Sequence, residues 1–448
     1  MNKNKYEIDM CNGTIMDKLV SFSLPLMLSG ILQLMFNAVD VIVVGRFAGS
    51  QALAAVGSTT ALINMFVNLF MGISLGTNVL AARFFAAGKD RQMSETVHTS
   101  IAFAAISGIV MVFVGIFFSK FALELMATPA DVIEQSTLYM RIYFLGMPFF
   151  MLYNYGAAIL RAVGDTKRPL IFLIISGVIN AVLNMILVIV FHLAVAGVAI
   201  ATVFSQMISC ILVLRCLYRS EGSYQFRFSK LMLKGCYLKQ IFQVGVPAGI
   251  QSTVINFSNV LLQSSVNSFG SIAMAGYKAA NNILGFLFVS VNSVTQACMS
   301  FTSQNYGVRK WKRMDKILVD CMILSMIVAL VLGGGSYIFG SQILRIYTEN
   351  EEVIRCGMEI LSYTTLTYFL CGFMDLFPGA MRGMGFSAAP MLLSIVGTVG
   401  TRIVWIFGIF PRYRSLSVLF ISYPVSWILT IAMQVVCFFI VRRKVHEK

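Results

Sequence analysis

Long apolar segments are the feature that most constrains this chain. Stretches of about 20 apolar residues recur along it, and that length is what an α-helix needs to cross a bilayer. Only 12% of the residues are charged, against roughly 25% in soluble domains, and 58% are apolar. We therefore predict an all-α, polytopic membrane protein. Twelve spans are expected near 17–44, 56–80, 97–118, 138–160, 170–190, 194–216, 240–268, 279–301, 317–340, 359–381, 389–410 and 416–441.

The basic residues predict the orientation. If both termini are cytoplasmic, 25 of the 34 Lys and Arg residues fall on the cytoplasmic side and 9 do not, as the positive-inside rule requires. We expect a multi-pass protein of the plasma (inner) membrane with both termini inside. The net charge of +15 lies in short loops between apolar runs, which argues against nucleic-acid binding.

Motifs for metal or hydrolytic chemistry are lacking. The nine cysteines form no Cys-x-x-Cys pair, and His98, His192 and His446 are scattered. There is also no P-loop lysine motif, so ATP is not expected to be the direct energy source. We expect no enzyme activity, metal or cofactor, and either passive transport or coupling to an ion gradient.

An internal repeat divides the chain into halves. Arg161, Gly164 and Pro169 recur 221 residues later as Arg382, Gly385 and Pro390, and the same offset relates Gly49-Ser50 to Gly270-Ser271. Six spans in each half give both halves the same orientation. The expected division is an N-terminal six-helix bundle at 1–216, a basic cytoplasmic linker at 217–239 and a C-terminal six-helix bundle at 240–448. Pseudo-two-fold symmetry of this kind is common in transporters.

Two carboxylates, Asp40 and Asp375, lie inside predicted spans, where a charge costs at least about 2.5 kcal/mol. Asp40 shares a helix face with Gln33 and Asn37 and has no Lys or Arg in mid-helix beside it. It is therefore free to bind a proton or Na⁺. In the second half Leu261 stands at the position of Asp40, so the coupling site should be asymmetric.

Amides also line the predicted spans, where they either join helices or contact substrate. Arg161 and Arg382 end their helices on the cytoplasmic side, and we interpret both as structural caps. The residues expected to line a substrate cavity are Gln33, Asn37, Asn64, Asn68, Tyr139, Asn154, Asn256, Asn259, Gln263, Asn282, Asn292 and Asp375.

Several short stretches, in this order and spacing, resemble the multidrug and toxic compound extrusion (MATE) transporters over nearly the whole chain. They are Pro25 through Asp40–Arg46, Ile159–Asp165, Ala380–Gly385 and Tyr423–Trp427. The resemblance implies a V-shaped pair of bundles that exports cationic or amphipathic compounds in exchange for H⁺ or Na⁺. It also places cation coupling on Asp40, Asn180, Asn184 and Thr202, with Tyr139 and Asn154 nearby.

Two positions depart from the family. Some members have an acid where this chain has Asn184, and some have a glutamate near Ile255 and Asn256. Fewer carboxylates favour proton coupling over Na⁺, although a neutral-ligand Na⁺ site stays open.

The leading hypothesis is that the chain is a monomeric antiporter, embedded in the lipid bilayer, that exports small organic substrates. The alternative is a flippase for lipids or lipid-linked oligosaccharides, which would need a strongly cationic cavity. A channel or purely structural protein fits the paired halves and Asp40 less well.

Overall fold

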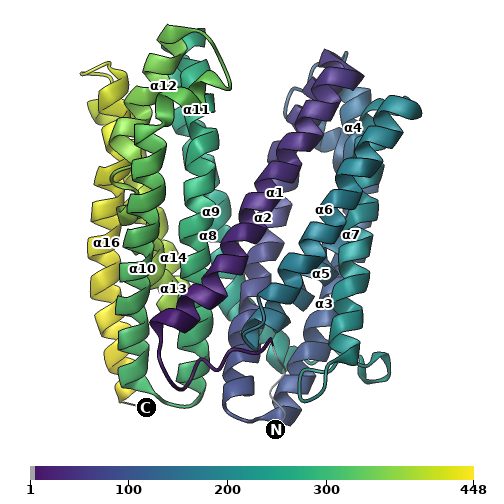
Figure 1. The fold of residues 1–448 in the computed structure, drawn as a ribbon, viewed down its shortest axis with the longest axis vertical. Coiled ribbons are helices and arrows are strands. Elements are labelled where there is room, and N and C mark those ends of the chain that lie inside the picture. The colour runs from purple at the N-terminus through teal and green to yellow at the C-terminus, as the bar shows by residue number, and fades with distance from the viewer. Residues whose placement is uncertain (1–5, 448) are drawn as a thin grey trace. The chain divides into compact units, whose positions relative to one another are not determined.

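The computed structural model describes residues 6–447, and within that range all regular secondary structure is helical (Figure 1). The prediction of an all-α fold is confirmed. The helices of the first half are α1 (Met16–Val43), η1 (Val44–Ala48), α2 (Ser50–Ala86), α3 (Asp90–Leu125), α4 (Ile133–Leu145), α5 (Met147–Ala162), α6 (Lys167–Met185), η2 (Ile186–Val190) and α7 (Ala194–Arg219). Those that follow are η3 (Phe228–Lys230), α8 (Gly235–Asn267), α9 (Ser271–Gly307), α10 (Trp311–Ile338), α11 (Gly340–Arg345), α12 (Glu351–Thr364), α13 (Tyr368–Gly383), α14 (Ala388–Ser394), η4 (Ile395–Gly400), α15 (Thr401–Val404), η5 (Trp405–Ile409) and α16 (Leu416–His446).

The helices account for the twelve predicted spans. Among the described residues, nine helical segments are long and apolar enough to cross a membrane, and two bent pairs of helices raise the number to 11. The remaining long helix is α8, with 33 residues. It is less apolar than the others because amides and hydroxyls recur along it, among them Gln251, Asn256, Asn259 and Gln263.

Two of the spans are broken, which hydropathy did not predict. α4 and α5 meet at 45° around Gly146, and α12 and α13 meet at 49° around residues 365–367. In the first pair Pro148 follows the break and supplies no backbone N–H. In the second pair the Thr365 and Thr367 hydroxyls donate to the carbonyls of Leu361 and Tyr363, a pattern that bends helices.

The predicted repeat is visible in the backbone. α2 and α9 both have 37 residues, and their first residues, Ser50 and Ser271, are 221 positions apart. The helix that follows begins at Asp90 in one half and at Trp311 in the other, again 221 apart. The preceding glycines, Gly49 and Gly270, have φ angles of 90° and 95°, which side chains disfavour. Each half therefore contains the same succession of helices.

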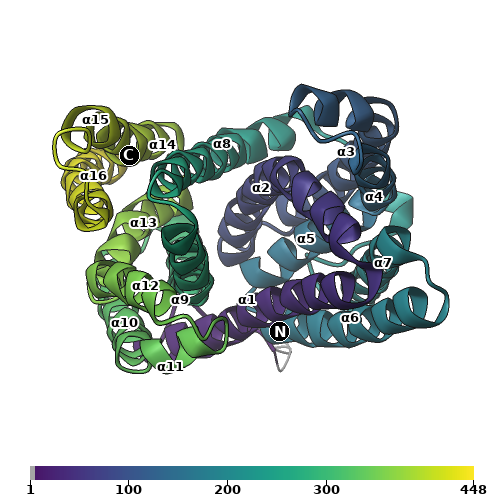
Figure 2. The same ribbon diagram turned by 90° about the horizontal axis from the view of Figure 1, so that it is seen from above.

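The chain divides into two compact units. Unit 1 comprises the residues up to Ile8 and Leu28–Phe242, and unit 2 comprises Asp9–Met27 and Gln243–Lys448. The boundary falls inside α1, so this helix contributes its N-terminal part to unit 2 and its remainder to unit 1. Figure 2 shows that remainder of α1 running beside α6, as it also does in Figure 1.

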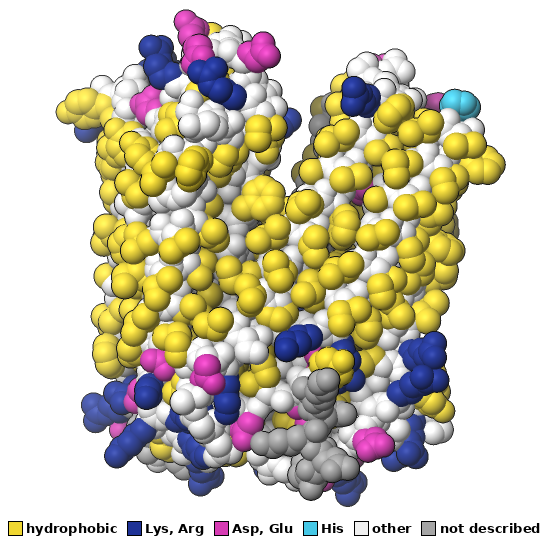
Figure 3. All heavy atoms as spheres, viewed as in Figure 1, with side chains coloured by type: hydrophobic (Ala, Val, Ile, Leu, Met, Phe, Trp, Pro, Cys, Tyr) yellow, Lys and Arg dark blue, Asp and Glu magenta, His cyan; other side chains and the backbone are white. Residues whose placement is uncertain are grey.

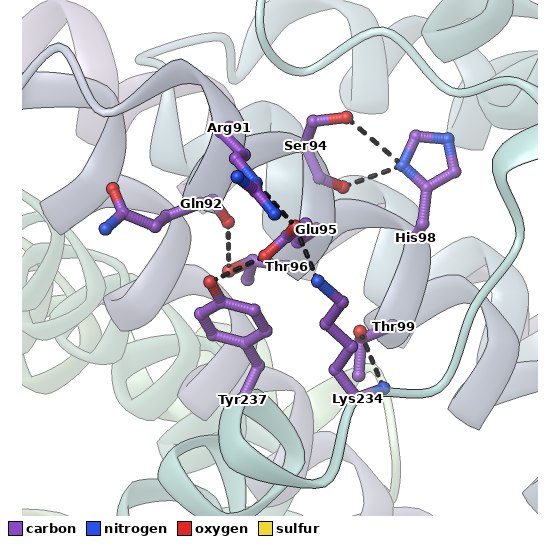
Figure 4. A network of polar contacts seen from close by, with 9 residues as sticks. All are labelled: Arg91, Gln92, Ser94, Glu95, Thr96, His98, Thr99, Lys234 and Tyr237. Carbon is purple, nitrogen blue, oxygen red and sulfur yellow. Dashed lines mark hydrogen bonds and ion pairs between the residues drawn. The ribbon is translucent and has the colours of Figure 1, made fainter.

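The segment 217–239 packs against unit 1 rather than lying free. Tyr224 and Phe226 are 1% exposed and belong to the same apolar cluster as residues of α3 and α5. Beyond them, Glu95 of α3 accepts hydrogen bonds from the Tyr237 hydroxyl at 2.8 Å and forms ion pairs with Lys234 and Arg91 (Figure 4). These contacts fix the start of α8 to α3.

The surface of each unit is that of a membrane protein. On the face shown in Figure 3, hydrophobic side chains cover the middle of each unit, and charged side chains gather at its ends. Phe117 of unit 1 and Val331 of unit 2 are 70% and 66% exposed, which is favourable only against lipid tails.

Candidate functional site

A close contact between α1 and α6 builds the site in unit 1. Gly177 of α6 faces Phe36 of α1 so closely that a Cβ atom there would lie 1.9 Å from the phenyl Cε2 atom. The absence of a side chain at Gly177 therefore lets the two helices approach. Asp40 lies one turn after Phe36, and Asn184 lies two turns after Gly177, so the contact brings both polar side chains together.

Asp40, Asn184 and Asn180 form a hydrogen-bonded cluster. The Asn184 side-chain amide donates to one Asp40 carboxylate oxygen and, at 3.3 Å, to Oδ1 of Asn180. Asn184 is fully buried, and Asn180 is 6% exposed. Oδ1 of Asn184 has no hydrogen-bond partner among the described residues. A buried carbonyl oxygen beside a carboxylate can accept a hydrogen bond or coordinate a cation.

Two tyrosines of α4 lie in the neighbourhood of this cluster. Tyr139 and Tyr143 both lie within electrostatic range of Asp40, and their ring centroids are 6.2 Å apart. Tyr143 was not predicted, although its helical spacing of four from Tyr139 places both on one face. Thr202 lies on α7, which packs against α6, but its hydroxyl donates to the Val198 carbonyl of its own helix.

The other predicted site residues form no second cluster with Asp40. Asn154 donates to the Phe150 carbonyl within α5, and Gln296 donates to Asn292 within α9. Asp375 is half-buried and accepts no hydrogen bond from the described residues. Exposed residues are Gln33, Asn37, Asn64, Asn256, Asn259 and Asn282, and Asn68 and Gln263 are half-buried.

Sequence reasoning overlooked Arg402 as a site residue. The predicted span 389–410 contains Arg402, yet the charge count only placed it among the non-cytoplasmic basic residues. In the structure it lies in α15, inside the apolar segment Ala388–Ile409, and is only 4% exposed. A charged residue in the interior of a predicted span was the signal that could have revealed it. Among the described residues, no group of His, Cys, Asp and Glu has the arrangement of a metal site.

Comparison with known proteins identifies relatives over the whole chain. The family model MatE matches residues 25–186 and 247–407. The chain is 29% identical over 425 residues to "Probable multidrug resistance protein YoeA" of Bacillus subtilis, which covers 92% of this chain and 91% of that protein. It is 23% identical over 433 residues to "Multidrug export protein MepA" of Staphylococcus haemolyticus, with 96% and 92% covered.

Solved structures share the fold. A structure described as "Crystal structure of MATE in complex with MaL6" superposes with a TM-score of 0.91 at 20% identity, and 99% of each chain is covered. A second, described as an "Outward-facing conformation of a multidrug resistance MATE family transporter of the MOP superfamily", has a TM-score of 0.89 at 20% identity, with 100% of this chain and 99% of the other covered.

Proposed function

The chain belongs to the MatE family, and from that premise we propose that it is a secondary antiporter. It exports cationic or amphipathic organic compounds and takes up H⁺ or Na⁺ in exchange. Two of its relatives are named as multidrug resistance or multidrug export proteins, which supports an export function. It works as a monomer in the plasma membrane with both termini cytoplasmic; residues 1–5 and 448 lie outside the described part of the chain.

The observation that carries this proposal is the environment of Asp40. Its carboxylate lies within the apolar span Met16–Ala48, accepts a hydrogen bond from a fully buried amide, and has no ion-pair partner among the described residues. A carboxylate without a basic partner inside a membrane is strongly favoured to take up a cation. Asp40 therefore holds the coupling ion, with Asn180, Asn184 and Thr202 around it.

The coupling ion is a proton in this proposal. Na⁺ binds best where several oxygen ligands, some of them charged, surround it. Here the only carboxylate of the cluster is that of Asp40, and Asn184 turns its amide nitrogen, not its oxygen, toward it. Protonation requires one carboxylate and no further ligands.

The organic substrate binds the exposed and half-buried polar residues of the two units. In unit 1 these include Asn37 and Asn64, and in unit 2 Asn256 and Asp375. Exposed amides on helices of membrane length are unfavourable against lipid, so these residues are expected to face water and ligand. The many apolar neighbours suit amphipathic compounds.

The experiment is ethidium export from cells that express the protein. The Asp40→Asn variant retains the shape of the side chain but not the charge, and we expect it to lose gradient-driven export. The exposed Asp131→Asn variant makes the same chemical change outside the spans and is the matched control. Unchanged export by Asp40→Asn at normal expression would overturn the proposed role.

A further inference from the structure

Unit 2 contains a cation that its own bundle does not neutralise. The guanidinium Nη1 of Arg402 donates to Oδ1 of Asn259 at 2.8 Å and to the Ser258 hydroxyl at 3.3 Å. The guanidinium carbon lies 4.6 Å from the centre of the Tyr423 ring, which is cation–π distance. Neutral groups thus hold one side of the guanidinium, and Nε on its other edge is buried without a hydrogen-bond partner among the described residues.

No carboxylate of the described residues forms an ion pair with Arg402. The one acid within the neighbouring α13, Asp375, interacts electrostatically with a different arginine, Arg382. Arg382 in turn donates to Gln251 at 2.5 Å. A buried charge without a counter-charge is costly at membrane depth. An anionic ligand would supply the missing charge.

A polar path connects Arg402 with the surface of unit 2. Asn259, which accepts from the guanidinium, is exposed on α8, and Asn256 is exposed one turn before it. α8 has 33 residues but is less apolar than the helical segments of this chain that could face lipid along their whole length. Amides on such a helix are stable against water rather than lipid, so a solute can reach Asn259 from the aqueous phase.

The repeat shows that this cluster is the counterpart of the Asp40 cluster. Tyr423 stands 221 residues after Thr202, and Arg402 stands one position after Thr401, the counterpart of Asn180. Equivalent helices of the two halves thus hold both clusters. An acid is central in one and an arginine in the other, so the ligand charge that each accepts is opposite.

We propose that Arg402, Asn259 and Tyr423 bind the carboxylate of an aromatic organic anion or zwitterion. The guanidinium edge whose Nε has no partner in the described part of the chain matches the two oxygens of a carboxylate. Aromatic rings surround it, because Tyr423 contacts Trp427 and hydrogen-bonds through its hydroxyl to Tyr277 at 3.1 Å. The inference rests on the proposed export function and extends its substrate class to compounds that carry a carboxylate.

Equilibrium binding to the full-length protein in lipid nanodiscs tests the proposal. The probes are 2-naphthoate and 2-naphthamide, which share one aromatic frame and differ in charge. The unmodified protein should bind naphthoate more tightly, and Arg402→Gln should reduce this preference by about tenfold or more, the usual effect of removing a charged hydrogen bond. Arg382→Gln removes another buried guanidinium and should leave the preference unchanged.

Equal binding of the two probes by the unmodified protein would overturn the proposal, as would an unaltered preference in a folded Arg402→Gln variant. If that variant does not fold, Asn259→Leu removes the exposed partner of the guanidinium and should lower the preference severalfold. No ion gradient is present in this assay. Failure here is therefore distinguishable from failure of Asp40-coupled export, which only the ethidium experiment reports.

Discussion

The polar clusters of unit 1 and unit 2 are built on equivalent helices and carry opposite charges. In unit 1 a carboxylate, Asp40, is bonded to a buried amide of α6. In unit 2 the apolar Leu261 occupies the position equivalent to Asp40. The charged residue there is Arg402, which follows the counterpart of Asn180. The starts of α2, α3, α5 and α6 recur 221 residues later as those of α9, α10, α13 and α14, yet the chemistry does not recur.

This difference shows how little of a site the backbone determines. Duplication of six helices gives two similar scaffolds, and in this proposal a few substitutions decide which ion each accepts. A transporter with a cation site in one half and an anion site in the other can bind zwitterions as well as cations.

The largest effect is expected from Asn184→Leu. The substitution removes the amide that donates to Asp40 and leaves the buried carboxylate without that partner. A hydrogen bond to a charged group contributes about 1.5–3 kcal/mol, so gradient-driven ethidium export should fall by about tenfold or more. The exposed Asn267→Leu variant of α8 is the control. Equal export by the two variants would separate Asn184 from coupling.

An intermediate effect is expected from Gly177→Ala. The added methyl group would overlap Phe36 and push α1 away from α6, at about 1–3 kcal/mol. Export should fall severalfold and the melting temperature in detergent should drop. Gly57→Ala is the matched control, since no atom lies within 4 Å of a Cβ there.

Restoring space should restore function. The double variant Gly177→Ala with Phe36→Ala should recover most of the lost export, because the clash is with the Phe36 ring. A double variant no better than Gly177→Ala would mean that α1 and α6 do not need this close contact.

The smallest effect is expected from Tyr423→Phe in unit 2. The hydroxyl bond to Tyr277, 3.1 Å long, is lost while the ring beneath Arg402 remains, so stability should fall by about 0.5–1.5 kcal/mol. Tyr423→Leu also removes the cation–π contact and should lower the melting temperature further. Equal melting temperatures for the two variants would show that the ring does not stabilise the arginine.

The sequence predicted the spans and the repeat because hydropathy and residue spacing carry that information directly. Asp40 was predictable for the same reason, as an isolated charge in an apolar run. The pairing of Asp40 with Asn184 needed the family resemblance, because the register of α1 on α6 depends on Gly177 and Phe36. No pattern in either helix alone specifies that contact.

The breaks in two spans and the buried contacts of Arg402 were not predicted. Both breaks leave the hydropathy of the span unchanged, and only the backbone around Gly146 and residues 365–367 reveals them. Arg402 lies inside the predicted span 389–410 but was only counted among the non-cytoplasmic basic residues, because its buried partners Ser258 and Tyr423 are far away in sequence. Contacts between distant helices are set by packing, which hydropathy does not contain.

The central claim is that Asp40 exchanges a proton for the organic cation. Proton movement into proteoliposomes can be followed with an internal pH dye in Na⁺-free choline buffer after ethidium is added. We predict a proton flux that depends on ethidium and is absent from Asp40→Asn. The account would be contradicted by ethidium transport that moves no protons in this buffer, or by a flux that Asp40→Asn retains.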